Sequence, residues 1–247
     1  MGLRILSIGG LDPCGGAGIT ADARMVQARG GQALTVATCL TIQNRHGVER
    51  VDAVAEEALR DSLGAALGDG VADAIKLGLM TTRAFDVVVD LLDGYDGPVV
   101  ADPVLGFTAG GEPPEDLVSA YRERLVVLHP VLTPNLDEIE KLAPAGGAGE
   151  LIDLGCRAVL VKGGHGVDDI VLDLLHDEDG EFGCEHPRRN IGPVHGTGCA
   201  LATALAWGLA SGRGLREACQ GAIEIVQTCL SKTPPSADGK PAPLVIV

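Results

Sequence analysis

Short apolar runs alternate along the chain with longer segments that carry apolar residues every three or four positions. The short runs predict strands, and the segments with helical spacing predict helices. The predicted strands are residues 4–9, 33–42, 48–54, 74–79, 98–101, 131–133 and 158–161, with a hairpin at 170–175 and 181–184. The predicted helices are residues 19–28, 55–67, 82–92, 114–125, one that opens at 134–138, 200–210 and 215–230. This alternation predicts an α/β fold with a mostly parallel sheet flanked by helices.

The domain organisation follows from the length and from the end of the pattern. A chain of 247 residues fits one large α/β domain, which we place at residues 1–232. Residues 233–247 are rich in Pro and polar residues before the apolar end Leu244-Val245-Ile246-Val247, and the pattern assigns them no element.

His195-Gly196-Thr197-Gly198-Cys199 leads directly into the apolar helix predicted at 200–210. Amides at a helix start have no intrahelical partner, and Gly on both sides of Thr197 lets an anion approach the backbone. The positive end of the helix is expected to lower the pKa of the Cys199 thiol from about 8.5 toward neutrality, which favours a thiolate base. The alternative interpretation is a Gly-rich turn followed by one small buried Cys.

Other polar residues follow predicted strands, where open α/β sheets bind ligands. The Gly-rich loop at 9–18 carries Asp12, and Asp102 follows the strand at 98–101. The amide of Gln43 has the geometry to pair with the edge of a nitrogen ring. Lys162 lies beside glycines, where it can meet phosphate. Each residue also has a plainer interpretation as part of a turn, a loop or the surface.

Asn135 and Glu138 are three residues apart at the start of a predicted helix, so they share a face. They can reach a hydrated metal jointly, or they can act as an ordinary cap, with Asn135 as N-cap and Glu138 as its partner. Residues 106–112 contain three Gly and are predicted to form a mobile loop that could act as a lid.

Composition and charge exclude several classes of function. Only 2 % of the residues are aromatic and the formal net charge is −15, which excludes nucleic-acid binding by stacking or by a basic surface. No apolar run reaches about 18 residues and the first residues lack a signal-peptide pattern, so we expect a cytoplasmic protein with no membrane contact. Seven cysteines without a C-x-x-C pair indicate neither a disulfide framework nor a zinc site.

Six short motifs occur along the chain in a defined order and spacing. The ordered set is much more specific to a protein family than any one motif alone. They are Asp12-Pro13-x-Gly15-Gly16-Ala17-Gly18, Gln43-Asn44, Asp102-Pro103-Val104, Thr133-Pro134-Asn135-x-x-Glu138, Lys162-Gly163-Gly164-His165 and His195-Gly196-Thr197-Gly198-Cys199. Together they resemble the hydroxymethylpyrimidine/phosphomethylpyrimidine kinases, the thiamine-pathway branch of the ribokinase-like superfamily. The resemblance covers residues 6–209 and implies a three-layer αβα ribokinase-like fold.

The resemblance implies ATP-dependent phosphorylation of 4-amino-5-hydroxymethyl-2-methylpyrimidine and of its monophosphate in thiamine biosynthesis, with Mg²⁺ as cofactor and a homo-oligomer as the expected assembly. It implies that the amides of Gly196, Thr197 and Gly198 bind the transferred phosphoryl group and that Cys199 is the base. The substrate-binding residues it implies are Asp12, Gly10, Gln43, Leu79, Met80 and Val104. Asp102 and Glu138 would organise Mg²⁺ directly or through water. The nucleotide contacts it implies are Lys162, Asn135 and Thr197.

The chain departs from the family pattern at several positions. Leu11 and Cys14 stand where the family commonly has Ser, and Gly106-Phe107-Thr108-Ala109-Gly110 replaces a lid of the type Val-Ala-Lys-Ser-Gly. The missing lid Lys bears on the rate and on the phosphorylation state of the substrate. Arg45-His46 replaces Thr-Arg, so the basic residue of this pair is shifted by one position. If the shifted basic residue contacts the phosphate of the substrate, the monophosphate would be the favoured substrate.

Two other functions fit part of the sequence. A pyridoxal or pyridoxine kinase shares the Cys-bearing motif and also acts on a hydroxymethyl group; Gln43 discriminates against it in part. A catalytically idle relative would bind a pyrimidine or a nucleotide as a sensor. The missing lid Lys supports the idle interpretation, whereas Asp102, Glu138 and Cys199 oppose it.

Overall fold

The computed structural model describes residues 2–44, 46–106, 117–164 and 169–247. Its strands are β1 (Arg4–Leu11), β2 (Gln32–Asn44), β3 (Gly47–Ala53), β4 (Ala74–Leu77), β5 (Val99–Ala101), β6 (Val131–Leu132), β7 (Ala158–Val161), β8 (Ile170–Asp177), β9 (Gly180–Pro187), β10 (Val194–His195) and β11 (Ala242–Pro243). Its helices are α1 (Gly18–Ala28), α2 (Glu56–Gly68), α3 (Thr82–Leu91), α4 (Val118–Glu123), α5 (Leu136–Leu142), α6 (Gly147–Asp153), α7 (Thr197–Ala210) and α8 (Leu215–Lys232), with a 3-10 turn at Leu125–Leu128.

Within the described ranges, nine strands form one sheet in the order β3-β2-β1-β4-β5-β6-β7-β8-β9. The pairs from β2 through β7 are parallel, and the antiparallel pairs β2–β3, β7–β8 and β8–β9 complete the two edges. All residues of β4 and β5 are buried, as expected for apolar strands covered on both faces. The expected α/β fold with a mostly parallel sheet is confirmed.

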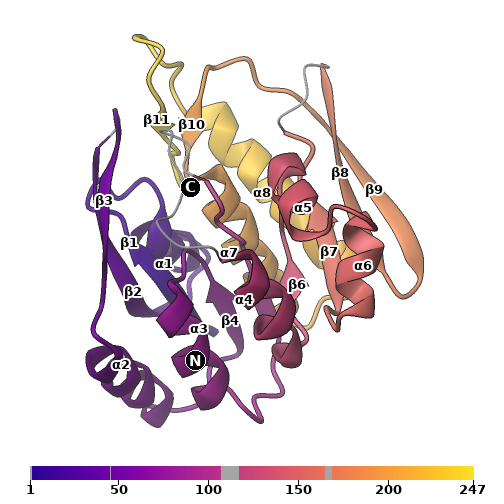
Figure 1. Ribbon diagram of the computed structural model, residues 1–247. Coiled ribbons are helices and arrows are strands. Elements are labelled where there is room, and N and C mark those ends of the chain that lie inside the picture. Colours follow the sequence, from indigo (N-terminus) through magenta and orange to yellow (C-terminus); the bar gives the residue numbers. More distant parts are fainter. Residues whose placement is uncertain (1, 45, 107–116, 165–168) are drawn as a thin grey trace.

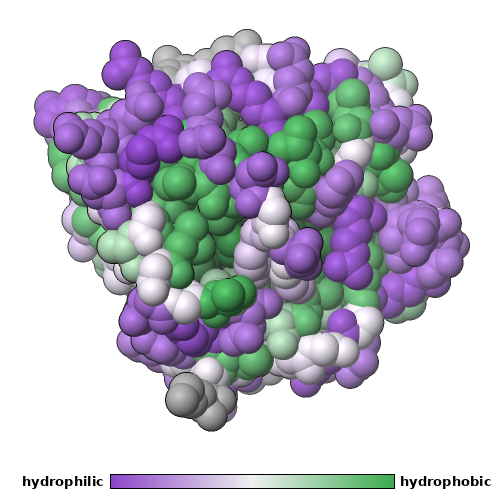
Figure 2. Space-filling view, turned by 90° about the horizontal axis from the view of Figure 1, so that it is seen from below, coloured by the Kyte–Doolittle hydropathy of each residue, from purple (hydrophilic) through white to green (hydrophobic). Residues whose placement is uncertain are grey.

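Helices cover both faces of this sheet and make three layers (Figure 1). Strand alternation divides the core: Leu6 and Ile8 of β1 join the cluster with α2, α3 and α4, whereas Ile5 joins the cluster with α1, α7 and α8. Figure 2 shows one outer face of the molecule, where hydrophilic side chains surround patches of apolar residues. None of the helices in the described part of the chain is long and apolar enough to cross a bilayer.

Most predicted elements are present with bounds shifted by one to three residues, but two helical regions differ from prediction. The helix predicted at 114–125 is α4, followed by the 3-10 turn, and residues 114–116 lie outside the described ranges. Helix α6 was not predicted, because its start at Gly146-Gly147-Ala148-Gly149 is typical of a turn. Residues 107–112 of the predicted lid, Arg45 and His165 also lie outside the described residues.

The C-terminal segment packs against the rest of the fold. Strand β11 pairs in parallel with β10, and the amides of Ala242 and Leu244 donate to the carbonyls of Pro193 and His195 at 3.0 and 3.1 Å. Leu244 is buried in the cluster formed by α1, α7 and α8. The residues to which the sequence pattern assigned no element therefore support the strand that leads into α7.

Candidate active site

One cavity of about 760 Å³ lies at the carboxyl ends of the parallel strands. It is lined by residues of all six sequence motifs, which β1, β2, β5, β6, β7 and β10 carry to the same edge of the sheet. Every predicted site residue lines it except Met80, a list that runs Gly10, Asp12, Gln43, Leu79, Asp102, Val104, Asn135, Glu138, Lys162, Gly196, Thr197, Gly198 and Cys199. Met80 does not line the cavity and is buried in the core cluster with α2 and α3.

The turn Gly196-Thr197-Gly198 at the start of α7 is the candidate phosphate-binding loop. Gly196 has a φ of 91°, in the left-handed region, which glycine adopts readily because it has no Cβ. Its carbonyl accepts the first hydrogen bond of the helix, from the Ala200 amide at 2.9 Å. A Cβ on Gly198 would lie 3.3 Å from both Asp102 Oδ2 and Lys162 Nζ. The helix start therefore lies beside the charged groups of the site, and the N-terminus of a helix favours a bound anion.

Cys199 lies in the first turn of α7, as predicted, but its predicted ionisation is wrong. Burial raises the pKa of the thiol to about 11, and the nearby carboxylates of Asp22 and Asp102 act in the same direction. The Lys76 ammonium and the Gly18 amide lower it by less. Desolvation therefore outweighs the helix start, and the thiol is neutral at physiological pH in the ligand-free protein.

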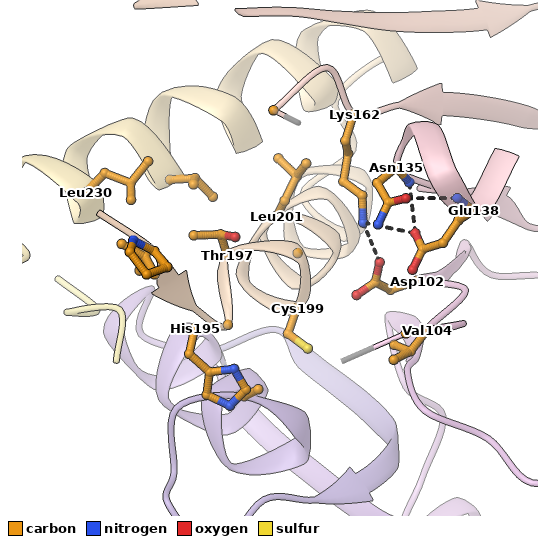
Figure 3. Close-up of a pocket in the computed structure, with 18 of the residues that line it drawn as sticks. Asp102, Val104, Asn135, Glu138, Lys162, His195, Thr197, Cys199, Leu201 and Leu230 are labelled. Carbon is orange, nitrogen blue, oxygen red and sulfur yellow. Dashed lines mark hydrogen bonds and ion pairs between the residues drawn. The ribbon is translucent and has the colours of Figure 1, made fainter. Parts of the chain in front are cut away.

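The acidic pair of the site is held by one lysine (Figure 3). Lys162 Nζ donates to Asp102 Oδ1 at 2.7 Å and lies 3.9 Å from Glu138 Oε2. Burial acts to raise the pKa of Asp102, but Lys162 and Lys76 outweigh it, so that the pKa is lowered. For Glu138 burial prevails over Lys162 and raises the pKa. An ionised Asp102 beside a less acidic Glu138 is an electrostatic pattern typical of a ligand site.

Asn135 and Glu138 form the cap of α5. Asn135 Oδ1 accepts from the Glu138 amide, and Glu138 Oε2 accepts from the Asn135 amide, both at 2.8 Å. Glu138 Oε1 accepts from the Leu105 amide at 3.4 Å. Of the two interpretations left open by the sequence, the structure shows the capping box, and it points the Glu138 carboxylate toward Lys162.

The residues present fit a hydrated divalent cation rather than a full protein cage. Among the described residues, no group of three or more His, Cys, Asp or Glu side chains is arranged to hold a metal. Asp102 and Glu138 offer carboxylate oxygens at 2.7 and 3.9 Å from Lys162 Nζ. Mg²⁺ is commonly bound by one or two carboxylates together with water and phosphate oxygens.

The end of the cavity near β1 and β2 is the part suited to a small ring. Leu79 and Val104 line it with apolar surface, and Gln43, which also lines the cavity, donates from Nε2 to Thr41 Oγ1 at 2.8 Å. A Cβ on Gly10 would lie 3.1 Å from Leu79 and 3.2 Å from Cys39, so the wall is close-packed here. Asp12 lines the same end, but its carboxylate binds other parts of the chain, as described below.

The opposite end of the cavity is lined by residues that the motifs did not identify. They are Leu201 of α7, Ile223, Val226, Gln227 and Leu230 of α8, and Arg188 and Arg189 before β10. The apolar residues of α8 belong to the same helical stripe that packs against the core, so their spacing alone does not separate them from core residues. They give this end an apolar wall with two arginines.

Comparison with known proteins agrees with this geometry. The profile of the family described as "Phosphomethylpyrimidine kinase" matches residues 12–242. The chain belongs to this family. A hydroxymethylpyrimidine/phosphomethylpyrimidine kinase of Streptomyces coelicolor is 34 % identical over 95 % of this chain and 91 % of its own length. The kinase of the same name from Escherichia coli is 34 % identical over 83 % of this chain and 82 % of its own length.

Solved structures place the fold beside two kinds of vitamin kinase. The pyridoxal kinase of Staphylococcus aureus in complex with AMP-PCP has a TM-score of 0.87 at 25 % identity, and the match covers 98 % of this chain and 93 % of that one. The phosphomethylpyrimidine kinase of Clostridium difficile has a TM-score of 0.78 at 27 % identity, over 92 % and 99 % of the two chains. The resemblance inferred from the motifs is confirmed at the level of family and of ribokinase-like fold.

Proposed function

We propose that the protein transfers a phosphoryl group from ATP to 4-amino-5-hydroxymethyl-2-methylpyrimidine and to its monophosphate. The observation that carries this proposal is the convergence of the phosphate-binding loop, Cys199, the Asp102–Lys162 pair and Gln43 in one cavity. Membership of the phosphomethylpyrimidine kinase family supports the choice of acceptor. Because the lid Lys of the family is missing, phosphorylation of the alcohol and phosphorylation of the monophosphate must each be tested.

The cavity offers one place for each reactant. The pyrimidine fits between Leu79, Val104 and Gln43, and the nucleotide fits the apolar end formed by α8 with its triphosphate toward Lys162. The amides of Gly196, Thr197 and Gly198 face the transferred group, where they would stabilise charge on its oxygens. Mg²⁺, held by Asp102 and Glu138, would neutralise charge on the phosphates when it is bound.

Cys199 is the proposed acceptor of the proton from the hydroxymethyl group. Because the free thiol is neutral, it must first release its own proton to solvent water, and the thiolate so formed can then accept the proton of the hydroxymethyl group. Phosphoryl transfer passes through a loose transition state, in which the attacking oxygen forms little bond before the leaving group departs. Positioning and charge stabilisation therefore supply most of the catalysis, and the base serves the last part of the step.

An ADP-release assay with Mg²⁺ and four acceptors tests the proposal: the pyrimidine alcohol, its monophosphate, pyridoxal and pyridoxine. We expect turnover with one or both pyrimidines. Turnover with pyridoxal alone would assign the pyridoxal-kinase activity, and binding of pyrimidine or ATP without any turnover would assign a sensor.

The variant Cys199→Ala tests the role of the base in the same assay. We expect kcat to fall by about 10²- to 10⁴-fold, the range for loss of a positioned base, while ATP binding measured by calorimetry is retained. Unchanged turnover would show that another residue is the base.

The cytoplasmic location and the homo-oligomer implied by the resemblance remain predictions. Size-exclusion chromatography with light scattering would measure the oligomeric state.

A further inference from the structure

The carboxylate of Asp12 is held by three hydrogen bonds from the protein itself. Oδ1 accepts from the amide of Cys14 at 2.8 Å, and Oδ2 accepts from the amide of Ala17 at 2.9 Å and from His195 Nε2 at 2.9 Å. The side chain is only 2 % exposed. A carboxylate offers about four acceptor positions, so three are filled before any substrate arrives. The buried carboxylate is poorly placed to bind the acceptor, the role that the resemblance implies.

These hydrogen bonds keep Asp12 ionised. Burial acts to raise the pKa of the carboxyl group, but the hydrogen bonds from His195, Cys14 and Ala17 outweigh it and lower the pKa. Because an ionised carboxylate only accepts hydrogen bonds, His195 Nε2 must carry a proton in this contact. The contact is therefore directional, from His195 to Asp12.

His195 directly precedes the phosphate-binding loop and is held from two sides. Its side chain contacts the loop after β1 through Asp12, and its carbonyl accepts from the Leu244 amide at 3.1 Å. A Cβ on Gly16 would lie 2.6 Å from His195 Cδ2, and a Cβ on Gly196 would lie 1.8 Å from the Gly16 carbonyl oxygen. The two loops are thus in direct contact, with no room between them for a side chain.

We propose that Asp12 and His195 form a clamp that positions the amides of Gly196, Thr197 and Gly198, and that Asp12 is a positioning residue rather than a ligand of the acceptor. This proposal rests on the proposed function, since it concerns the same phosphate-binding loop. Misplacement of a catalytic group by about 1 Å can cost 10²-fold in rate. Loss of the clamp should therefore act on phosphoryl transfer and leave binding of the acceptor ring unchanged.

The variants His195→Ala and Asp12→Asn test the clamp through steady-state kinetics. We expect kcat to fall by about 10- to 100-fold in each, with the KM for the pyrimidine within twofold of wild type. His195→Gln, whose amide can still donate a hydrogen bond, should recover part of the loss. A raised KM for the pyrimidine with unchanged kcat in Asp12→Asn would overturn the proposal, because it would identify Asp12 as a ligand.

His176→Ala is the matched control. The His176 side chain is 21 % exposed, as is that of His195, and it lies 3.4 Å from the Glu181 carboxylate in the β8–β9 hairpin, outside the cavity lining. We expect its kinetics to equal those of wild type. A loss equal to that of His195→Ala would overturn the proposal, because it would show a general effect of removing a His–carboxylate contact.

Hydrogen exchange of the ligand-free protein separates the clamp from the kinase activity. In His195→Ala the amides of Cys14 and Ala17, which donate to Asp12, and the amide of Ala200, which donates to Gly196, should exchange faster than in wild type. The same amides should be unchanged in His176→Ala. Unchanged exchange in His195→Ala would overturn the clamp, whereas absence of turnover with every acceptor would overturn the proposed function and leave this measurement valid.

Discussion

The ionisation of Cys199 is a residue-scale property that can be measured directly. With the thiol pKa raised to about 11 by burial, the thiolate fraction should rise tenfold for each pH unit between pH 7 and 9. Alkylation of Cys199 by iodoacetamide, followed by peptide mass spectrometry, should therefore accelerate tenfold per unit across this range without levelling off. Free cysteine, with an ordinary pKa of about 8.5, is the control and should approach its plateau near pH 9. If the alkylation rate of Cys199 reached a plateau below pH 8, the pKa of its thiol would lie near neutrality, as the helix start alone suggests, and the raised pKa would be wrong.

Gly196 is the residue at which backbone conformation and close contact coincide. An Ala there would need a left-handed conformation, and its Cβ would lie 1.8 Å from the Gly16 carbonyl oxygen. The left-handed conformation alone costs about 1–2 kcal/mol, and the contact forces the backbone to shift as well. Gly196→Ala should therefore lower both the urea midpoint of unfolding and kcat, the latter by at least about 10²-fold, since misplaced amides are costly.

Gly212→Ala is the control for that variant. Gly212 also has a positive φ, of 79°, but a Cβ added there meets no atom within 4 Å. It should show a lowered unfolding midpoint from the conformational cost alone and a kcat within twofold of wild type. Equal loss of kcat in the two variants would show that backbone strain, rather than contact with the Gly16 loop, governs activity.

At this scale the sequence predicted positions better than properties. The motif spacing identified Cys199, Lys162 and Gln43 as residues of one site, because residues that follow parallel strands meet at one edge. The ionisation of Cys199 depends on Asp22 and Asp102, which come from other elements, so local spacing could not predict it. Met80 next to Leu79 shows the same limit, because Leu79 lines the cavity whereas Met80 is buried in the core cluster, and spacing does not separate the two.

At the scale of elements, a buried ion pair joins α1 to β4 beneath the site. Lys76 Nζ lies 2.8 Å from Asp22 Oδ2, and both side chains have zero exposure. Ser7 and Thr203 donate to the same carboxylate, so each of its two oxygens accepts a hydrogen bond from the protein. Burial acts to lower the pKa of Lys76, but the neighbouring acidic groups, with Asp22 first among them, together outweigh burial and raise the pKa. The network fixes the spacing of α1, α7 and the sheet.

Lys76→Met should therefore leave Asp22 as a buried carboxylate without its counterion. Breaking a buried pair by removing one partner costs about 3–5 kcal/mol of unfolding free energy, which urea titration would measure. Arg50→Gln is the control, because it removes one partner of the exposed Arg50–Asp52 pair and should leave the midpoint unchanged. If Lys76→Met were as stable as Arg50→Gln, the buried pair would not hold these elements together.

The bounds of elements were predicted best where apolar runs are bordered by polar residues. Strand β7 was predicted at its observed residues because four apolar residues are bordered by Arg157 and Lys162. Helix α6 was missed because glycines occupy its first turn, and tertiary burial of Ala148 and Leu151 holds it in place instead. The capping role of Asn135 was one of two interpretations, and only the positions of the Asn135 and Glu138 amides decided between them.

At the scale of the whole molecule, the parallel topology explains why six motifs far apart in sequence form one site. The order β2-β1-β4-β5-β6-β7 brings the carboxyl ends of these strands side by side, and α7 crosses behind them with its N-terminus at the same edge (Figure 1). The sequence predicted this arrangement because helices alternate with strands. It could not place residues 233–247, whose structure depends on pairing with β10 rather than on their own pattern.

The last segment of the chain should therefore contribute to the stability of the whole fold. Leu244 is 1 % exposed and contacts the core shared by α1, α7 and α8, whereas Val247 is 42 % exposed. Leu244→Ala should lower the unfolding free energy by about 2–5 kcal/mol through loss of buried surface and formation of a cavity. Val247→Ala, a surface substitution in the same segment, should stay within about 0.5 kcal/mol of wild type. Urea unfolding of both variants tests this prediction. Equal midpoints would mean that the segment does not stabilise the fold. A lower midpoint in Leu244→Ala alone would show that burial of Leu244 stabilises the fold around the strand that carries His195.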